Sequence, residues 1–355
     1  MTGDQFDVED DDVVVRLVPP EISADDRAAL GWDDDLAAAL AALDTELPAA
    51  RVSRLDRGWS TALWGADGPE LRLRNIGADV AVGDWIVASI DGERVEHVLP
   101  RRSAFVRRAS FEGARGESHT VAANIDDVFL LHSLTNPPNP RRLERELVLA
   151  FDSGARPTIV LTKLDAVDDP SNVADEVRAV ALGVPVVVTS SRSGTGLDQL
   201  RPDGHRTIAL LGASGVGKST LVNALVGGDV QRTADVRDGD QRGRHTTTAT
   251  QLVHLPGKGW LIDTPGLRAV SLWSSGHGIE RAFADVFDLV DHCRFRDCKH
   301  EQEPGCAVQA AIEDGRLDPI RLESMKRLVA EEAALEDEQR ERERAQDRRR
   351  GPRHS

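Results

Sequence analysis

A glycine-rich segment that ends in lysine and serine is the strongest chemical signal in this sequence. Residues 212–220 read GASGVGKST and match the pattern GxxxxGK[ST], with an apolar run at 207–211 before them and a helix-like run at 221–225 after them. Glycines let the chain curl until successive backbone N–H groups face a phosphate, and a helix N-terminus adds positive potential. Lys218 is predicted to bridge the outer phosphates, and the Ser219 hydroxyl to bind Mg²⁺. The predicted phosphate loop comprises Gly212, Ala213, Ser214, Gly215, Val216, Gly217, Lys218, Ser219 and Thr220.

A strand-like run that ends in aspartate supplies further candidate contacts to phosphate and magnesium. Residues 261–266 read LIDTPG, in which Asp263 can hold Mg²⁺ through water and the backbone N–H of Gly266 can meet a terminal phosphate. Between this segment and the phosphate loop, residues 242–248 read RGRHTTT. A loop threonine at this place can complete the Mg²⁺ shell and sense the outer phosphate. We therefore predict magnesium ligands at Ser219, Asp263 and either Thr246 or Thr247, with the choice between the threonines open.

Two short segments upstream indicate which base is bound. Residues 162–165 read TKLD and resemble the [NT]KxD motif of GTPases, and residues 190–194 read SSRSG after a later strand-like run. The Asp165 carboxylate can accept two hydrogen bonds from the N1–H and 2-amino groups of guanine, which adenine does not offer. Thr162 stands where Asn is commoner, which weakens one guanine contact. The predicted base contacts are Thr162, Lys163, Leu164, Asp165, Ser190 and Ser191, and the predicted ligand is GTP with Mg²⁺.

The order of these segments along the chain is unusual. It runs TKLD, SSRSG, phosphate loop, HTTT and DTPG, whereas ordinary GTPases begin with the phosphate loop. A circular permutation explains the order, because motifs at the carboxyl ends of parallel strands still meet at one edge of the sheet. The segment after DTPG then leads directly into the C-terminal region. We infer that the nucleotide state is read out there.

Three cysteines and one histidine form a second cluster with recognisable chemistry. Cys293, Cys298, His300 and Cys306 follow the spacing C-x4-C-x-H-x5-C. Three thiolates and one imidazole are the donor set of a closed, tetrahedral zinc site with a structural role. The surrounding residues are polar and charged, which argues against three cysteines of a buried core. The sequence therefore predicts one structural Zn²⁺ in the C-terminal region.

The elements that must position these residues are read from the apolar pattern. Residues 120–275 alternate apolar, often β-branched runs with helix-like stretches, which is typical of a parallel sheet covered on both faces. Short strand-like runs separated by turns over 51–108 predict a small barrel or sandwich. The expected units are an acidic, partly disordered extension (1–47), a barrel (48–115), a circularly permuted α/β domain with the phosphate loop (120–275), a helical zinc domain (278–335) and a charged tail (336–355).

The net charge of −16 would by itself argue against a nucleic-acid partner, but the charge is unevenly spread. Residues 1–47 hold 14 acidic residues and 2 arginines, so the rest of the chain has a net charge of only −4. We interpret the extension as a solvated tail that could mask a basic barrel. Arginines beside Phe105 and Phe111 can grip phosphates and stack on bases, although a solvated barrel edge explains them nearly as well. The candidate RNA-binding residues are Arg101, Arg102, Arg107, Arg108 and Arg115.

Composition also indicates the cellular compartment in which the protein works. The three cysteines lie within 14 residues of one another, which is a poor disulfide framework and predicts a reducing compartment, the cytoplasm. No apolar run approaches the 18 residues of a membrane span, and the acidic start MTGDQFDVEDDD is unlike a secretory signal. We expect a monomer without a membrane partner.

Together these motifs resemble the ribosome small-subunit-dependent GTPase A family, which consists of circularly permuted GTPases of bacterial ribosome assembly. The resemblance covers residues 48–335, and the pairing of GRHTTT with the cysteine–histidine spacing is specific. It implies an N-terminal OB-fold barrel, a permuted GTPase domain and a C-terminal zinc domain. It also implies rRNA binding, GTP hydrolysis stimulated by the small ribosomal subunit, and release of the protein from that subunit. The acidic extension is unexpected in this family.

The residue that orients the attacking water is expected to lie outside the position that it occupies in Ras-type enzymes. Leu267 follows DTPG, where Ras-type enzymes place a water-orienting Gln, so unstimulated hydrolysis should be slow. His245 is our candidate for positioning the water, alongside Lys218 and Asp263, because imidazole can accept a proton near neutral pH; a loop histidine that contacts only rRNA or backbone is the alternative. Other interpretations are a permuted GTPase acting on another ribosomal particle, a non-enzymatic nucleotide-sensing RNA-binding assembly factor, and, more distantly, an ATP-using protein.

Overall fold

The structure of the 355-residue chain is a computed structural model. The structure describes residues 17–107, 119–181, 183–200, 205–227, 250–255, 257, 259–263 and 277–350. The helices are α1 (Ala24–Ala29), α2 (Asp34–Ala41), α3 (Pro140–Asp152), α4 (Ser171–Val180), α5 (Lys218–Val226), α6 (His277–Ala282), α7 (Ala284–Val290), α8 (Ala307–Glu313) and α9 (Pro319–Arg350). The strands are β1 (Ala50–Asp56), β2 (Trp59–Leu63), β3 (Glu70–Arg74), β4 (Trp85–Ala88), β5 (Val95–Val98), β6 (Ala104–Arg107), β7 (His119–Ala123), β8 (Asp127–Ser133), β9 (Arg156–Thr162), β10 (Val186–Val188), β11 (Thr207–Gly212), β12 (Gln251–Leu255) and β13 (Gly259–Asp263).

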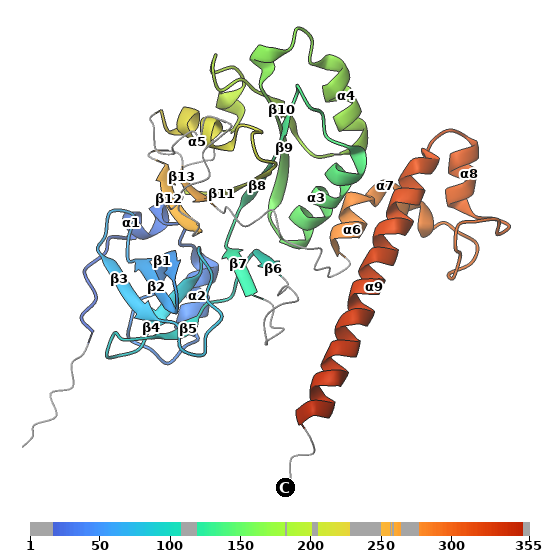
Figure 1. The fold of residues 1–355 in the computed structure, drawn as a ribbon. Coiled ribbons are helices and arrows are strands. Elements are labelled where there is room, and N and C mark those ends of the chain that lie inside the picture. The colour runs from blue at the N-terminus through green and yellow to red at the C-terminus, as the bar shows by residue number, and fades with distance from the viewer. Residues whose placement is uncertain are drawn as a thin grey trace, which may run out of the picture.

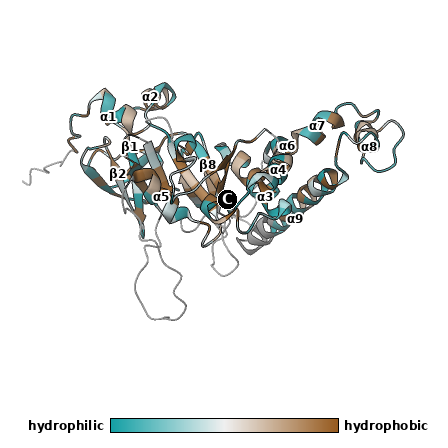
Figure 2. Ribbon diagram, turned by 90° about the horizontal axis from the view of Figure 1, so that it is seen from above, coloured by the Kyte–Doolittle hydropathy of each residue, from teal (hydrophilic) through white to brown (hydrophobic). Residues whose placement is uncertain are grey.

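A parallel sheet in the order β10-β9-β8-β11-β13 forms the centre of the molecule (Figure 1). Alternate residues of β8 enter different cores, because successive side chains of a strand point to opposite faces. Val128 and Leu130 pack in the core that includes residues of α3 and α4, whereas Phe129 and Leu131 pack with residues of α5. Figure 2 shows hydrophobic residues gathered in these central strands. The predicted parallel sheet with helices on both faces is confirmed.

The strands of the N-terminal part pair in a closed ring. β2 pairs with both β1 and β3, and β4 pairs with both β1 and β5. A parallel bridge between Arg74 and Arg94 joins the end of β3 to the start of the β5 edge. Inside the ring lies a separate apolar core that includes Val52, Leu73 and Ile86. The ring order is therefore β1-β2-β3-β5-β4.

One antiparallel pairing joins the ring to the central sheet. β12 pairs with β13 along its whole length and contacts β1 where Arg54 lies opposite Gln251. The two sheets therefore form one continuous hydrogen-bonded path from β10 to β3. β12 follows the HTTT segment in sequence, and β13 ends at Asp263. The hairpin between the HTTT segment and the DTPG segment is thus also the edge that pairs with the ring.

The described part of the acidic extension differs from the solvated tail that its composition predicts. Leu30 and Leu36 are buried in the main core, and the completely buried Arg51 donates to the carbonyl oxygen of Leu30 at 2.5 Å. Trp260 on β13 donates from Nε1 to the carbonyl oxygen of Ala29 at 2.7 Å. Apolar residues spaced among the acids explain the difference. Leu30 caps the end of α1 and Leu36 lies on α2, and both are buried, whereas Asp25, Asp34 and Asp35 of these helices are exposed.

The C-terminal region is helical, as its sequence predicts, but its last helix is longer than expected. α9 continues to Arg350, so the charged tail is helical over most of its length, and the helix extends away from the rest of the molecule in Figure 1. Arg340 pairs with Glu336 and Asp337 one helical turn earlier. Such i,i+3 and i,i+4 pairs stabilise a polar helix that has little apolar surface to bury.

Candidate nucleotide and metal sites

The phosphate loop has the predicted strand before it and the predicted helix after it. β11 ends at Gly212, and α5 begins at Lys218. Gly215 and Gly217 adopt positive φ angles of +73° and +106°, a conformation that residues other than glycine rarely adopt. The Lys218 ammonium donates to the carbonyl oxygens of Gly212 and Ala213 at 2.9 and 2.7 Å. These bonds fold the lysine side chain back over the loop.

Thr162 connects the base-recognition segment to the phosphate loop. Its buried hydroxyl lies 2.7 Å from the carbonyl oxygen of Val216 and 3.2 Å from that of His132. The carbonyl of Val216 belongs to the turn that carries Gly217, so this contact fixes the turn relative to β9. The TKLD motif predicts that Thr162 contacts the base, and the structure gives it this further role in positioning the loop.

Asp165 and Ser190 come together from two neighbouring strands. The Ser190 hydroxyl donates to a carboxylate oxygen of Asp165 at 2.6 Å, and Arg192 lies 3.7 Å from the other oxygen. The hydrogen bond from Ser190, followed by the charges of Arg192 and Lys163, lowers the pKa of Asp165. Lys163 adopts a left-handed conformation, φ +63°, which turns the chain sharply after β9. The carboxylate is therefore ionised and oriented, as acceptance of two guanine N–H groups requires.

Asp263 ends β13 beside the phosphate loop, because β13 is the parallel neighbour of β11. Burial raises the pKa of Asp263, and the positive charge of Lys218 opposes this rise. A carboxylate and the Ser219 hydroxyl at the start of α5 offer oxygen ligands of the kind that Mg²⁺ takes. Ser191 and Ser214 lie in loops, whereas Leu164 begins a short 3-10 helix and Thr220 lies in the first turn of α5. His245, Thr246, Thr247 and Gly266 lie outside the described residues.

The predicted metal ligands form one cluster. The ligand atoms of Cys293, Cys298, His300 and Cys306 all lie within 4.8 Å of one another. The Nδ1 atom of His300 lies 3.6 Å from the Cys293 sulfur and 3.5 Å from the Cys306 sulfur, and those two sulfurs lie 3.9 Å apart. Zn–S bonds of about 2.3 Å and Zn–N bonds of about 2.05 Å at tetrahedral angles require edges of about 3.8 Å and about 3.6 Å. The distances among Cys293, His300 and Cys306 therefore match edges of a zinc tetrahedron, and Cys298 lies close enough to supply the fourth donor.

Two helices support this cluster in a way that the sequence did not signal. His300 adopts a left-handed conformation, φ +56°, and its carbonyl oxygen accepts hydrogen bonds from Gln309 on α8 and Lys326 on α9. The Cys306 sulfur accepts from the backbone N–H of Gln309 at the start of α8. A strained backbone persists where its surroundings hold it. Gln309 and Lys326 are thus supporting residues, which no motif marked because they lie on separate helices.

Comparison with known proteins identifies the family. The model of the RsgA GTPase family matches residues 98–273. "Small ribosomal subunit biogenesis GTPase RsgA" of Methanosarcina acetivorans is 42% identical over 311 residues, which cover 85% of this chain and 84% of the relative. The protein of the same name from Streptomyces coelicolor is 44% identical over 321 residues, 86% of each chain. The chain belongs to the RsgA GTPase family. It is therefore a GTPase.

Two solved structures share the fold. The crystal structure of YjeQ from Thermotoga maritima aligns with a TM-score of 0.58 and 24% identity over 80% of this chain and 98% of that one. The crystal structure of YloQ, described as a circularly permuted GTPase, aligns with a TM-score of 0.57 and 23% identity over 82% of this chain and 96% of that one. The predicted permutation is confirmed at the level of the fold.

The candidate RNA-binding arginines divide into two groups in this RsgA-family chain. Arg101 binds both carboxylate oxygens of Asp84, and Arg102 pairs with Asp33. Both guanidinium groups therefore have carboxylate partners within the protein, Arg101 at a buried aspartate and Arg102 at an exposed one. Their contact with RNA stays a prediction. Arg107 ends β6, whereas Arg108 and Arg115 lie outside the described residues. Within the described part of the chain, no helix is both long and apolar enough to cross a membrane.

Proposed function

We propose that this protein is a GTP-driven switch in late maturation of the small ribosomal subunit. Relatives more than 40% identical over most of the chain bear the name small ribosomal subunit biogenesis GTPase. The observation that carries the nucleotide part is the contact of Ser190 with Asp165, because it orients an ionised carboxylate in the position that selects guanine. The partner in this proposal is the small ribosomal subunit, which appears in the names of the relatives. The protein contacts the rRNA of that subunit and acts in the cytoplasm.

The residues of the site divide the work of phosphoryl transfer. Lys218 and the backbone N–H groups of the loop bind the phosphates, while Thr162 holds the loop in register with the base site. Ser219, Asp263 and a threonine of the HTTT segment would hold Mg²⁺, which would supply positive charge to offset the negative charge that develops on GDP, the leaving group. Leu267 offers no polar group for the attacking water, so a further group must orient it. We assign that role to His245.

Two flanking units complete the proposal. The ring order β1-β2-β3-β5-β4, with β3 and β5 parallel, supports assignment of residues 48–115 as an OB-fold barrel. The fit of the cysteine–histidine cluster supports one structural Zn²⁺ in the region 278–335. Arg321 on α9 contacts Glu144 of α3, Asp285 of α7 and the carbonyl oxygen of Ala282 on α6. This buried guanidinium joins the GTPase domain to the helices that follow DTPG, as a nucleotide readout in the C-terminal region requires.

The test is phosphate release from GTP by the full chain with and without purified small ribosomal subunits. We expect slow turnover alone and strong stimulation by the small subunit. Stimulation by the large subunit alone would favour another ribosomal particle, and no turnover under any condition would favour a nucleotide sensor without catalysis. His245→Ala should bind GTP normally and lose the stimulated turnover. Unchanged stimulated turnover in this variant would remove His245 from the mechanism. Sedimentation of the isolated protein tests the predicted monomer.

A further inference from the structure

The described part of the acidic extension, residues 17–47, lies where the ring meets the central sheet. Two consecutive carbonyl groups at the end of α1 bond to different sheets. The carbonyl oxygen of Ala29 accepts a hydrogen bond from Nε1 of Trp260 on β13 at 2.7 Å. The carbonyl oxygen of Leu30 accepts one from Nη1 of Arg51 on β1 at 2.5 Å. Figure 1 shows α1 beside β12. One helix end therefore contacts both the GTPase domain and the ring.

Arg51 is the residue at which the surrounding segments converge. Its buried guanidinium also donates to the carbonyl oxygens of Gly83 and Asn124 at 3.4 and 3.1 Å, and to the Thr207 hydroxyl at 2.8 Å. Gly83 belongs to the ring, and Thr207 begins β11 of the GTPase domain. Burial lowers the pKa of Arg51 to about 10, so the side chain stays charged near neutral pH. The carbonyl groups at the end of α1 stabilise this charge, because they carry the negative end of the helix dipole.

The residues after α1 fit closely into the same junction. Gly31 has a φ angle of +88°, and a Cβ atom added there would lie 3.2 Å from Nη1 of Arg51 and 3.3 Å from the carbonyl oxygen of His205. A larger residue at position 31 would therefore strain the backbone and crowd both domains. Trp32 packs edge-on against Trp85 of β4, with ring centroids 4.8 Å apart.

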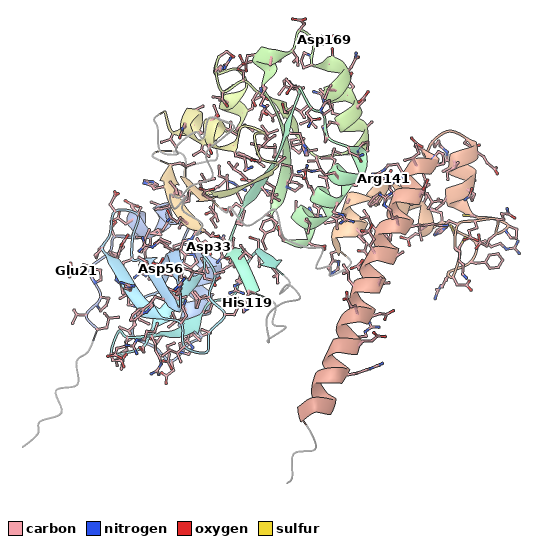
Figure 3. All side chains as sticks on the ribbon, in the orientation of Figure 1. Glu21, Asp33, Asp56, His119, Arg141 and Asp169 are labelled. Atoms are coloured by element: carbon pink, nitrogen blue, oxygen red, sulfur yellow. The ribbon has the colours of Figure 1, made fainter. Side chains whose placement is uncertain are left out.

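The direct pairing between the two sheets is shorter than this interface. Within the described strands, β1 and β12 share a single register pair, Arg54 with Gln251. Asp33, labelled in Figure 3, adds an ion pair with Arg102, which lies just before β6. The acidic segment therefore supplies a large part of the contacts that join the ring to the GTPase domain.

These contacts lie at the amino ends of two strands that lead to the nucleotide site. Trp260 is opposite Thr207 in the parallel pairing of β13 with β11. β13 ends at Asp263, and β11 ends at Gly212, the first residue of the phosphate loop. The acidic segment thus holds the ring against the opposite ends of the strands that carry these two residues.

We propose that residues 17–47 form a clamp that joins the ring to β11 and β13, so that docking of the ring on a partner displaces the strands that carry Asp263 and the phosphate loop. The clamp acts through the backbone carbonyl groups of Ala29 and Leu30, whereas masking of the ring by this segment would act through its carboxylates. The inference rests on the proposed function for the docking partner, the small ribosomal subunit, and it names how that subunit regulates the nucleotide site.

The first measurement is amide hydrogen exchange of the isolated full chain, followed in β1, β12 and β13. Trp260→Phe keeps an aromatic ring but removes the donor to Ala29. Exchange in these strands should become about 2- to 13-fold faster, which corresponds to the loss of one hydrogen bond. Gly31→Ala, which strains the backbone beside Arg51, should have a larger effect in the same strands. α4, which contacts β10 at the opposite end of the sheet, should exchange as in wild type.

The second measurement is GTP hydrolysis by the same variants with and without purified small subunits. We expect the kcat of the stimulated reaction to fall by about 5-fold or more, which is the lower end of the range for coupling between two sites. The KM for GTP and the rate without subunits should stay as in wild type. A merely structural role of the segment would lower the unstimulated rate as well.

Two control variants separate the clamp from other effects. Trp64→Phe makes the same change at a buried tryptophan in the core of the ring, and it should leave the stimulation and the exchange of β12 and β13 unchanged. The double change Asp34→Asn with Asp35→Asn removes exposed charges from α2, and it should also leave both unchanged. Wild-type exchange in both Trp260→Phe and Gly31→Ala would overturn the proposal. A loss of stimulation in the aspartate variant equal to that of the junction variants would also overturn it.

The proposed function and this inference can fail separately. If small subunits stimulate the wild type and the junction variants equally, only the inference fails. If small subunits do not stimulate the wild type, the proposed function fails, and the exchange measurements still decide whether the clamp joins the two domains.

Discussion

Arg101 holds the completely buried carboxylate of Asp84 with two hydrogen bonds, of 2.8 Å from Nε and 2.7 Å from Nη2. Burial raises the pKa of Asp84, and the guanidinium opposes that rise. The remaining donors of Arg101 bind Asp79 and Thr120, so the side chain connects three parts of the ring region. Arg101 is therefore a structural residue, although its sequence neighbours mark it as a candidate for RNA.

We expect Arg101→Leu to lower the free energy of unfolding of the ring by about 3–5 kcal/mol, because it leaves a buried carboxylate without its partner. Arg102→Gln should cost only about 0–1 kcal/mol, since its pair with Asp33 is exposed. Urea unfolding followed by tryptophan fluorescence compares the two, because Trp85 lies in the same region. Equal losses in both variants would contradict the structural role of Arg101.

Thr162→Val should weaken GTP binding by about tenfold, equivalent to about 1.4 kcal/mol, because the carbonyl oxygen of Val216 loses its buried donor. Thr162→Ser keeps the hydroxyl and should stay close to wild type. Titration of both variants with a fluorescent GTP analogue provides the measurement. Wild-type affinity in Thr162→Val would show that the contact does not position the phosphate loop.

Magnesium-dependent GTP binding should weaken on acidification sooner than an ordinary aspartate would allow. The pKa of Asp263 is raised by burial, and only the ionised carboxylate can hold Mg²⁺ through water. As pH falls, Asp263 is protonated before Asp165, because the pKa of Asp263 is raised and that of Asp165 is lowered. Mg²⁺ titrations over a series of falling pH values should show the loss in wild type.

The matched variant for this prediction is Asp263→Asn, which cannot ionise. It should bind Mg²⁺ weakly at every pH value, and its small remaining affinity should lack the pH dependence. A pH dependence that persists unchanged in Asp263→Asn would assign the titration to another group.

Metal analysis of the purified chain should find one zinc per molecule. Removal of zinc with a chelator should increase amide hydrogen exchange in α8 and the ligand loop, because Cys306 and His300 then lose the ion that joins them. GTP affinity should stay unchanged, since the phosphate loop belongs to a different core. Cys298→Ser should reproduce the effect of the chelator. Unaltered exchange in α8 after complete metal removal would contradict a structural site.

Asp165→Asn should shift nucleotide preference away from GTP, because an amide cannot accept both guanine N–H groups. Competition by ATP and GTP for the labelled analogue measures the shift. The matched variant Ser190→Ala keeps the carboxylate but removes its orienting donor, so it should reduce GTP affinity without changing the preference. Equal competition by ATP and GTP in the wild type would contradict guanine recognition.

The sequence by itself predicted the chemistry of the nucleotide and metal sites. Lys218, Asp165, Asp263 and the cluster around His300 stand in short motifs whose spacing is set by local turns and helix starts, so their roles can be read without the rest of the fold. The permuted order was also visible, because order is a property of the chain. The parallel sheet followed from continuous apolar runs, which only a sheet covered on both faces buries.

Only the tertiary structure decided which arginines are free. Arg101 and Arg72 look alike in sequence, but one lies against a buried carboxylate from a distant turn and the other lies on an open strand face beside Trp59. Long-range contacts of this kind have no local signal. The same holds for Leu30 and Arg51, which anchor an acidic segment that composition alone places in solvent. Whether a residue is buried depends on residues distant in sequence that pack against it, and only the tertiary structure brings those residues together.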